Sequence, residues 1–105
     1  MKPYLLGIDI GTSACKIAVF DREGHVKASS SGNYRVYYPR EGWAEQDPRE
    51  WWEAVCLAVR GALHTGGIRP EEIAGIGIDG QSWSAIPVDQ EGHVLYNTPI
   101  WMDTR

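Results

Sequence analysis

The strongest constraint on the fold is a helix signal in the middle of the chain. Asp47 is a typical N-cap residue, Pro48 fits the first helical position, and Glu50 lies three residues after the cap. Apolar residues then recur at three- and four-residue spacing, which predicts a helix with one apolar face until Gly66-Gly67 ends it. The face consists of Trp51, Trp52, Val55, Ala58, Val59, Ala62 and Leu63. We therefore expect one long helix whose apolar side, including both tryptophans, packs on a sheet.

Short β-type segments lie on both sides of this helix. Before it, we expect strands at residues 4–10, 16–20 and 26 to about 34, joined as a meander whose third strand is less apolar and nearer an edge. Residues 37–45 are expected to form a loop. After the helix, we expect a compact strand at residues 73–78, then a hairpin of residues 84–88 and 93–96, followed by loop residues. The order predicts an α/β fold with a βββαβ beginning.

One short sequence occurs twice between β-type segments. Residues 21–26 read Asp-Arg-Glu-Gly-His-Val, and residues 89–94 read Asp-Gln-Glu-Gly-His-Val. The glycine in each copy supplies the positive φ that a tight hairpin connection needs. We expect the same local turn twice, without a repeat architecture.

Size and charge exclude several classes of function. The 105 residues are 43% hydrophobic, which suits one modest domain, and the net charge of −4 argues against binding to nucleic acid or anionic lipid. Asp9 interrupts the first apolar segment where a signal peptide needs continuous hydrophobicity, and no membrane-spanning segment follows. Cys15 and Cys56 lie far apart without metal-ligand spacing, so we expect buried, unreactive thiols in a reducing, cytoplasmic compartment.

The first turn carries the residues best suited to phosphate chemistry. Gly11, Thr12 and Ser13 offer backbone N–H groups and two hydroxyls to phosphate oxygens, and Lys16 can balance the remaining charge. Asp9 can hold Mg²⁺ through water. No helix follows directly, so this is neither a GxGxxG nor a Walker A loop, and the hairpin itself must form the phosphate site. The same residues also fit an ordinary hairpin turn that Asp9 caps.

Four segments resemble one enzyme family. Residues 9–13 (Asp-Ile-Gly-Thr-Ser), with Lys16, resemble the first phosphate motif of the superfamily of sugar kinases, actin and heat-shock chaperone ATPases. Residues 38–48 (Tyr-Pro-Arg-Glu-Gly-Trp-Ala-Glu-Gln-Asp-Pro), 76–83 (Ile-Gly-Ile-Asp-Gly-Gln-Ser-Trp) and 99–105 (Pro-Ile-Trp-Met-Asp-Thr-Arg) are similar to segments of the FGGY carbohydrate kinases. The resemblance covers nearly the whole chain. It implies a ribonuclease H-like, actin-like ATPase fold, with a mixed sheet and a packed helix.

The resemblance implies transfer of the ATP γ-phosphoryl group to a sugar or polyol hydroxyl. Asp9 would then serve Mg²⁺, and Gly11, Thr12, Ser13 and Lys16 would bind the ATP phosphates. The acceptor side would be formed by Gln81, Ser82, Trp83, Trp101 and Asp103. Gln81 and Asp103 suit sugar hydroxyls, whereas the two tryptophans offer flat apolar faces to the C–H side of a sugar. Asp79 fits either a turn cap or a hydrogen-bond partner behind the site.

Within the family, the sequence is most similar to xylulokinases but departs from their pattern. Xylulokinases usually follow the glutamine with methionine and histidine, where this chain has Ser82 and Trp83. Trp-Met-Asp-Thr-Arg also replaces their usual Trp-Asn-Asp-Gly-Arg, with Asp103 and Arg105 retained. The implied acceptor is a pentulose such as D-xylulose. The alternatives are gluconate, glycerol, ribulose or another polyol, and an actin-like ATPase module without kinase activity.

The family's greater length implies that residues 1–105 are a partial N-terminal domain. The family's catalytic aspartate, second phosphate loop and adenosine site would follow Arg105, so we expect the isolated chain to be inactive. A fragment of this kind should also expose a sheet edge and apolar surface, which favours a homodimer or aggregation.

Overall fold

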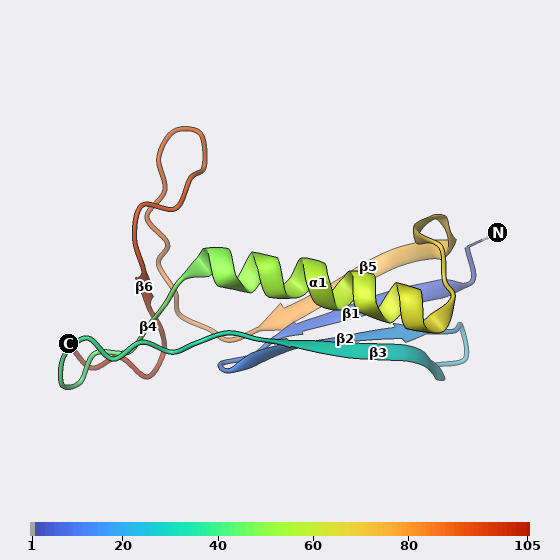
Figure 1. The fold of residues 1–105 in the computed structure, drawn as a ribbon, viewed down its shortest axis with the longest axis horizontal. Helices are drawn as coiled ribbons and strands as arrows, with labels where there is room; N and C mark the ends of the chain where they lie inside the picture. The colour runs from blue at the N-terminus through green and yellow to red at the C-terminus, as the bar shows by residue number, and fades with distance from the viewer. Residues whose placement is uncertain (1) are drawn as a thin grey trace.

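The computed structural model describes residues 2–105 and contains a four-stranded mixed sheet with one long helix on one face (Figure 1). The sheet strands are β1 (Tyr4–Ile10), β2 (Ala14–Phe20), β3 (Val26–Asn33) and β5 (Ile73–Gly80). The other elements are helix α1 (Pro48–Gly66), the 3-10 turn η1 (Pro70–Glu72) and the two-residue strands β4 (Glu45–Gln46) and β6 (Thr98–Pro99). The predicted α/β class and the βββαβ order of the sheet and its helix are confirmed.

The sheet has the strand order β3-β2-β1-β5. The first three strands form the predicted antiparallel meander with β3 at the edge, and β5 runs parallel to β1 after the chain crosses over in α1. The second strand begins at Ala14, two residues earlier than expected, which shortens the turn to residues 11–13. Likewise, β5 continues to Gly80, so that Asp79 belongs to the strand and not to the turn after it.

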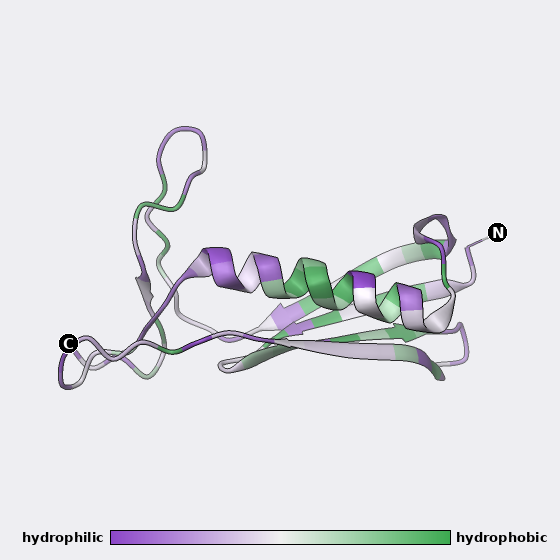
Figure 2. Cartoon of the chain, in the orientation of Figure 1, coloured by the Kyte–Doolittle hydropathy of each residue, from purple (hydrophilic) through white to green (hydrophobic). Residues whose placement is uncertain are grey.

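The core lies between α1 and the helix-facing residues of β1, β2 and β3 (Figure 2). Because side chains alternate along a strand, Ile8 of β1 and Ile17 of β2 point to the helix and are buried, whereas Asp9 and Lys16 point to the opposite face. The helix contributes small side chains to this core, among them Ala58. These small residues allow the helix to lie close to the sheet.

Both ends of α1 follow the sequence signal, although one contact differs. The Asp47 carboxylate accepts a hydrogen bond from the Arg49 N–H at 3.0 Å, and Gly67 adopts the left-handed conformation with φ of 63°. The Glu50 side chain, however, does not accept a hydrogen bond from the Asp47 N–H, as a capping box would require. Its carboxylate accepts bonds from the Tyr37 hydroxyl and the Arg35 N–H instead, so it ties the preceding loop to the helix.

Two burial expectations were wrong. Trp51 packs against the core, but Trp52 is 70% exposed, because successive helical residues are rotated by about 100° and cannot both face the sheet. Cys15 is fully buried as expected, whereas Cys56 is only half-buried on α1.

The hairpin expected at residues 84–96 forms only around its turn, without the predicted strands. Within the described residues this segment forms a single bridge, between Val88 and Val94, and extends away from the sheet (Figure 1). A two-stranded hairpin needs a third strand or a helix to cover it, and here Val88, Leu95 and Tyr96 are all exposed. The next residues instead form β6, which pairs with β4 beside the start of α1.

The apolar surface expected of this chain is present along β5. Ile76 is 60% exposed and Ile78 is 67% exposed, although both lie on the helix side of the sheet. The helix covers β2 and β3 and reaches β1 only slightly, so β5 has no covering element among residues 2–105. None of the helices in this part of the chain has the length and apolar composition that a membrane crossing requires.

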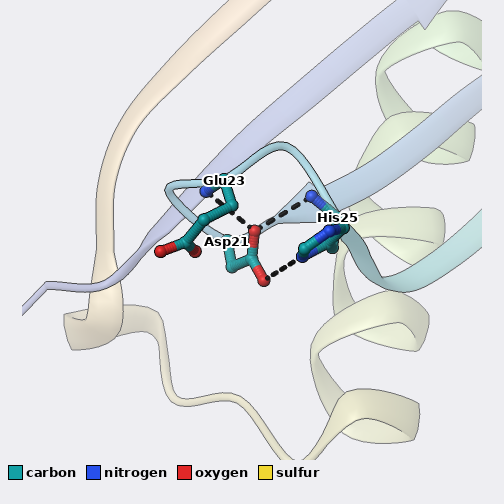
Figure 3. Close-up of side chains that lie close together, drawn as sticks. All are labelled: Asp21, Glu23 and His25. Carbon is teal, nitrogen blue, oxygen red and sulfur yellow. Dashed lines mark hydrogen bonds and ion pairs between the residues drawn. The ribbon is translucent and has the colours of Figure 1, made fainter.

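The recurring sequence does form the same turn twice, as predicted. In the first copy, Asp21 Oδ1 accepts the N–H groups of Glu23 and His25, each at 2.9 Å, and Oδ2 contacts the His25 ring (Figure 3). In the second copy Asp89 makes the equivalent three contacts. The glycines have φ of 88° and 85°. Although each Asp-Glu-His group brings potential metal ligands together, the turn geometry already accounts for the arrangement.

Candidate functional site

The predicted phosphate-site residues meet at one end of the sheet, where β1 and β5 end in hydrophilic tips (Figure 2). Asp9 lies opposite Lys16 on β2 and opposite Asp79 on β5. All three line a shallow hollow of about 750 Å³ on the face of the sheet away from α1. The fold therefore places two carboxylates and one ammonium group side by side, directly before the turn at residues 11–13.

Asp9 and Asp79 are paired on neighbouring strands, and Asp9 affects the ionisation of Asp79. A side-chain hydrogen bond with Asp9, together with charge repulsion from it, raises the pKa of Asp79 above its ordinary value. Two carboxylates held in register on neighbouring strands offer the oxygen ligands that Mg²⁺ prefers, and a cation would offset their repulsion. Sequence reasoning left Asp79 undecided, because only the pairing of β1 with β5 brings it next to Asp9.

The turn at residues 11–13 has an arrangement suited to an anion. The Gly11 N–H donates to the Ala14 carbonyl at 3.0 Å and closes the hairpin. By contrast, the N–H groups of Thr12 and Ser13 have no acceptor among residues 2–105. Successive backbone N–H groups of this kind form anion-binding concavities in proteins. The arrangement fits the predicted phosphate role of Gly11, Thr12 and Ser13.

Three of the predicted acceptor residues lie together beside this turn. Trp83, Trp101 and Asp103 line a hollow of about 410 Å³ with Pro99 and Ile100. The Trp101 indole N–H donates to the Thr12 hydroxyl oxygen at 2.9 Å, which joins this hollow to the turn. Trp83 is 89% exposed and has a φ of 72°, a strained value for a bulky residue.

The other two predicted acceptor residues are placed differently. The Gln81 side-chain N–H₂ donates to Gln46 Oε1 at 2.7 Å and approaches the Gly11 carbonyl at 3.4 Å, so Gln81 lies beneath the turn and not in the hollow beside Trp83. Ser82 is exposed and does not line that hollow. Gln81 Oε1 is buried and has no hydrogen-bond partner among residues 2–105, so the hydroxyl-binding role expected for Gln81 stays a prediction.

Asp103 connects the last residues of the chain to an earlier loop. Its carboxylate accepts bonds from the Ala44 N–H at 2.8 Å and from Arg105, and the Arg105 bond is the largest cause of a pKa lowered to about 2. Arg105 also pairs with Glu45 at 2.7 Å, and its guanidinium lies 3.8 Å from the centre of the Trp43 ring. Asp103 thus shapes the hollow as part of a charged cluster with Arg105 and Glu45, which we call the clamp.

The clamp gives a pH-dependent prediction. An aspartate whose folded pKa is depressed stabilises the folded form above its ordinary pKa of about 3.9, and this contribution is lost as pH falls through the folded value. We expect the clamp to be complete above about pH 4 and to release towards pH 2, as seen in the NMR signals of the Ala44 amide and the Trp43 indole. Asp103→Asn should weaken it above about pH 4, where Asp103 is charged, with Asp89→Asn as the control. Titration of the Ala44 signal at the ordinary pKa would contradict the assignment.

Two polar residues of this region were not singled out from the sequence. Tyr34 and Gln46 are both buried and both donate hydrogen bonds to carbonyl groups of the 11–13 turn. Gln46 stands between two acids just before the helix, a position that indicates a solvated loop. Only the structure shows that its side chain points inward, where it is fully buried and bonded to the turn, to Trp51 and to Gln81.

Comparison with known proteins agrees with the fold. Residues 4–105 match the FGGY family of carbohydrate kinases, N-terminal domain. The chain is 39% identical over 103 residues to glycerol kinase 2 of Thermotoga maritima, covering 97% of this chain and 21% of that protein. The structure of xylulose kinase from Rhodospirillum rubrum superimposes with a TM-score of 0.89 at 26% identity, over 97% of this chain and 21% of that one.

A third relative carries a bound nucleotide. The structure of Plasmodium falciparum glycerol kinase with ADP superimposes with a TM-score of 0.85 at 27% identity, over 97% of this chain and 21% of that chain. The chain therefore spans about a fifth of the length of these relatives. Glycerol kinases and xylulose kinases both match, so the narrower resemblance to xylulokinases does not single out a subfamily. The match over residues 4–105 shows that the chain belongs to the FGGY family of carbohydrate kinases.

Proposed function

We propose that the full-length protein is a kinase that transfers the γ-phosphoryl group of ATP to a hydroxyl of a sugar or polyol. Residues 1–105 would be a partial N-terminal domain that supplies part of the phosphate site and part of the acceptor pocket. The observation that carries this proposal is the hydrogen bond from the Trp101 indole to the Thr12 hydroxyl. This bond connects two features: an aromatic hollow that suits a sugar, and a turn that suits phosphate.

On the nucleotide side, this chain offers hydrogen-bond donors and one positive charge. The N–H groups and hydroxyls of Thr12 and Ser13 would bind phosphate oxygens, and Lys16 would neutralise part of their charge. Asp9 would hold Mg²⁺ through water, with Asp79 beside it. When bound, the ion would supply charge neutralisation for the phosphates. The relative bound to ADP supports a nucleotide as the ligand.

On the acceptor side, the aromatic surface favours a substrate with several carbon atoms. Trp83 and Trp101 offer apolar faces to the C–H groups of a sugar, and the exposed, strained Trp83 is the kind of residue that a ligand would cover. The exposed Ser82 can offer a hydroxyl, and Asp103 can accept from one. We propose a pentulose such as D-xylulose as the acceptor. Glycerol is the second candidate, because glycerol kinases are among the relatives.

Phosphoryl transfer by the full-length protein tests this proposal. A coupled assay of ADP formation with D-xylulose, D-ribulose, D-gluconate and glycerol should give the highest kcat/KM for D-xylulose. A higher value for glycerol would favour the second candidate. ATP hydrolysis without any acceptor, accompanied by polymerisation, would favour an actin-like module instead. The isolated residues 1–105 should show no turnover with any acceptor.

A substitution in the aromatic hollow distinguishes acceptor binding from nucleotide binding. Trp83→Ala in the full-length protein should raise the KM for the acceptor by about 10- to 100-fold, because burial of a large apolar side chain contributes about 1.5–3 kcal/mol. The KM for ATP should stay unchanged. Trp52→Ala is the matched control, because Trp52 is an exposed tryptophan on α1. An equal effect on both KM values would argue against a pocket at Trp83.

A further inference from the structure

Gln46 is a fully buried polar residue next to the proposed phosphate turn. Its side chain is 0% exposed and its amide group makes three hydrogen bonds. Gln46 Nε2 donates to the Thr12 carbonyl at 2.5 Å, and Oε1 accepts from the Trp51 indole N–H at 2.9 Å and from the Gln81 amide at 2.7 Å. A buried side chain with this many partners holds a single orientation.

The Trp51 indole sets the direction of this amide. An indole N–H can only donate a hydrogen bond, so the atom of Gln46 that faces Trp51 must be the oxygen. The nitrogen of Gln46 therefore faces the turn, where the Thr12 carbonyl accepts from it. Trp51 lies in the first turn of α1, so the helix N-terminus orients a donor towards the Thr12 carbonyl.

Tyr34 holds the preceding carbonyl in the same way. Its hydroxyl donates to the Gly11 carbonyl at 2.5 Å, and its side chain is only 8% exposed. Burial first, and then the nearby Cys15 and Asp9, raise the pKa of Tyr34 to about 12. The hydroxyl thus keeps its proton at neutral pH and stays a donor.

These two bonds determine which way the turn presents its N–H groups. In a planar trans peptide the C=O and N–H bonds point in opposite directions, and no peptide within residues 2–105 is cis. Because the Gly11 carbonyl is held by Tyr34, the Thr12 N–H points away from Tyr34. Because the Thr12 carbonyl is held by Gln46, the Ser13 N–H points away from Gln46. These are the two N–H groups that lack an acceptor in the described chain.

We propose that Gln46 and Tyr34 are positioning residues, which hold two successive peptides so that the Thr12 and Ser13 N–H groups face the phosphates of the nucleotide. This inference rests on the proposed kinase function and assigns a role to two residues that would not touch the substrate themselves. It also gives Trp51 a role besides packing, because its N–H fixes the orientation of Gln46.

Two variants with little change in shape test the inference. Gln46→Glu keeps an acceptor for Trp51 and Gln81 but cannot donate to the Thr12 carbonyl as a carboxylate. Tyr34→Phe keeps the ring in the core and removes only the donor to Gly11. In the full-length protein, calorimetry should show about a 10- to 100-fold loss of ADP affinity in each variant, the range expected for one hydrogen bond to a charged group. Adenosine affinity should stay unchanged, because adenosine has no phosphate.

Matched controls and a spectroscopic measurement complete the test. Gln90→Glu and Tyr38→Phe make the same chemical changes at exposed positions and should bind ADP as the wild type does. In NMR spectra, ADP should shift the Thr12 and Ser13 amide signals of the wild type, whereas the Ser13 shift should be reduced in Gln46→Glu and the Thr12 shift in Tyr34→Phe. If the wild type binds ADP and both variants bind it equally well, or lose adenosine affinity to the same extent, the inference is wrong. If the wild type binds no nucleotide, the proposed function fails and the inference fails with it.

Discussion

Replacement of Asp9 by asparagine is expected to lower kcat of the full-length protein by about 10³-fold, the size of effect seen when one preorganised electrostatic contact to the transition state is lost. Asparagine keeps the shape of Asp9 but removes the negative charge that would hold Mg²⁺ at the phosphates. The measurement is steady-state ADP formation at saturating ATP and acceptor. The Mg²⁺ concentration needed for half-maximal rate should also rise.

The same substitution should stabilise the protein. Asp79 has a pKa raised above its ordinary value by Asp9, so the folded state binds the Asp79 proton more tightly than the unfolded state does. Its contribution to stability is therefore complete below the ordinary pKa and is lost as pH rises through the raised one. Asp9→Asn removes the cause, so the melting temperature at pH 7 without Mg²⁺ should rise and depend less on pH.

The control for Asp9→Asn is Asp89→Asn, which removes the same charge from a turn outside the site. This control should keep its catalytic rate. Because Asp89 accepts three hydrogen bonds in its turn, its loss should lower the melting temperature and not raise it. An Asp9→Asn protein that keeps a rate close to that of the wild type would contradict the role assigned to Asp9.

The second large effect is expected at Gly32, where α1 crosses close to β3. A Cβ atom at this position would lie 2.9 Å from the Ala54 carbonyl oxygen and 3.1 Å from the Ala54 Cβ, so the helix would have to move. Gly32→Val should lower the free energy of unfolding by about 2 kcal/mol, within the range for overpacking. The β-propensity of valine favours a strand by at most about 1 kcal/mol, so the steric term decides the sign.

Urea denaturation followed by tryptophan fluorescence measures this change in the free energy of unfolding. Gly77→Ala is the control, since a Cβ at Gly77 meets nothing within 4 Å. Gly77→Ala should change the free energy of unfolding little, whereas Gly32→Val should shift the unfolding midpoint to a lower urea concentration. A Gly32→Val protein as stable as the wild type would show that α1 does not approach β3 as closely as the structure has it.

Local chemistry alone determined several parts of this protein. The helix from Pro48 to Gly66 follows from a capping aspartate, a proline and a glycine pair, and all of these act within a few residues. The two Asp-to-His turns follow from a short sequence whose side chain bonds its own backbone. The turn at residues 11–13 was predicted for the same reason, because its residues are consecutive.

Tertiary structure decided everything that depends on which strand lies beside which. The pairing of β1 with β5 brings Asp79 next to Asp9, although 70 positions separate them. Trp51 and Trp52 have the same side chain but lie on different sides of α1. Trp52 is exposed, whereas Trp51 is on the side that meets the sheet and orients Gln46. The sequence specified the turn at residues 11–13, for which we propose a phosphate-binding role. Long-range packing specified the direction of its N–H groups, because the donors that hold its carbonyls come from β4 and from the residue that follows β3.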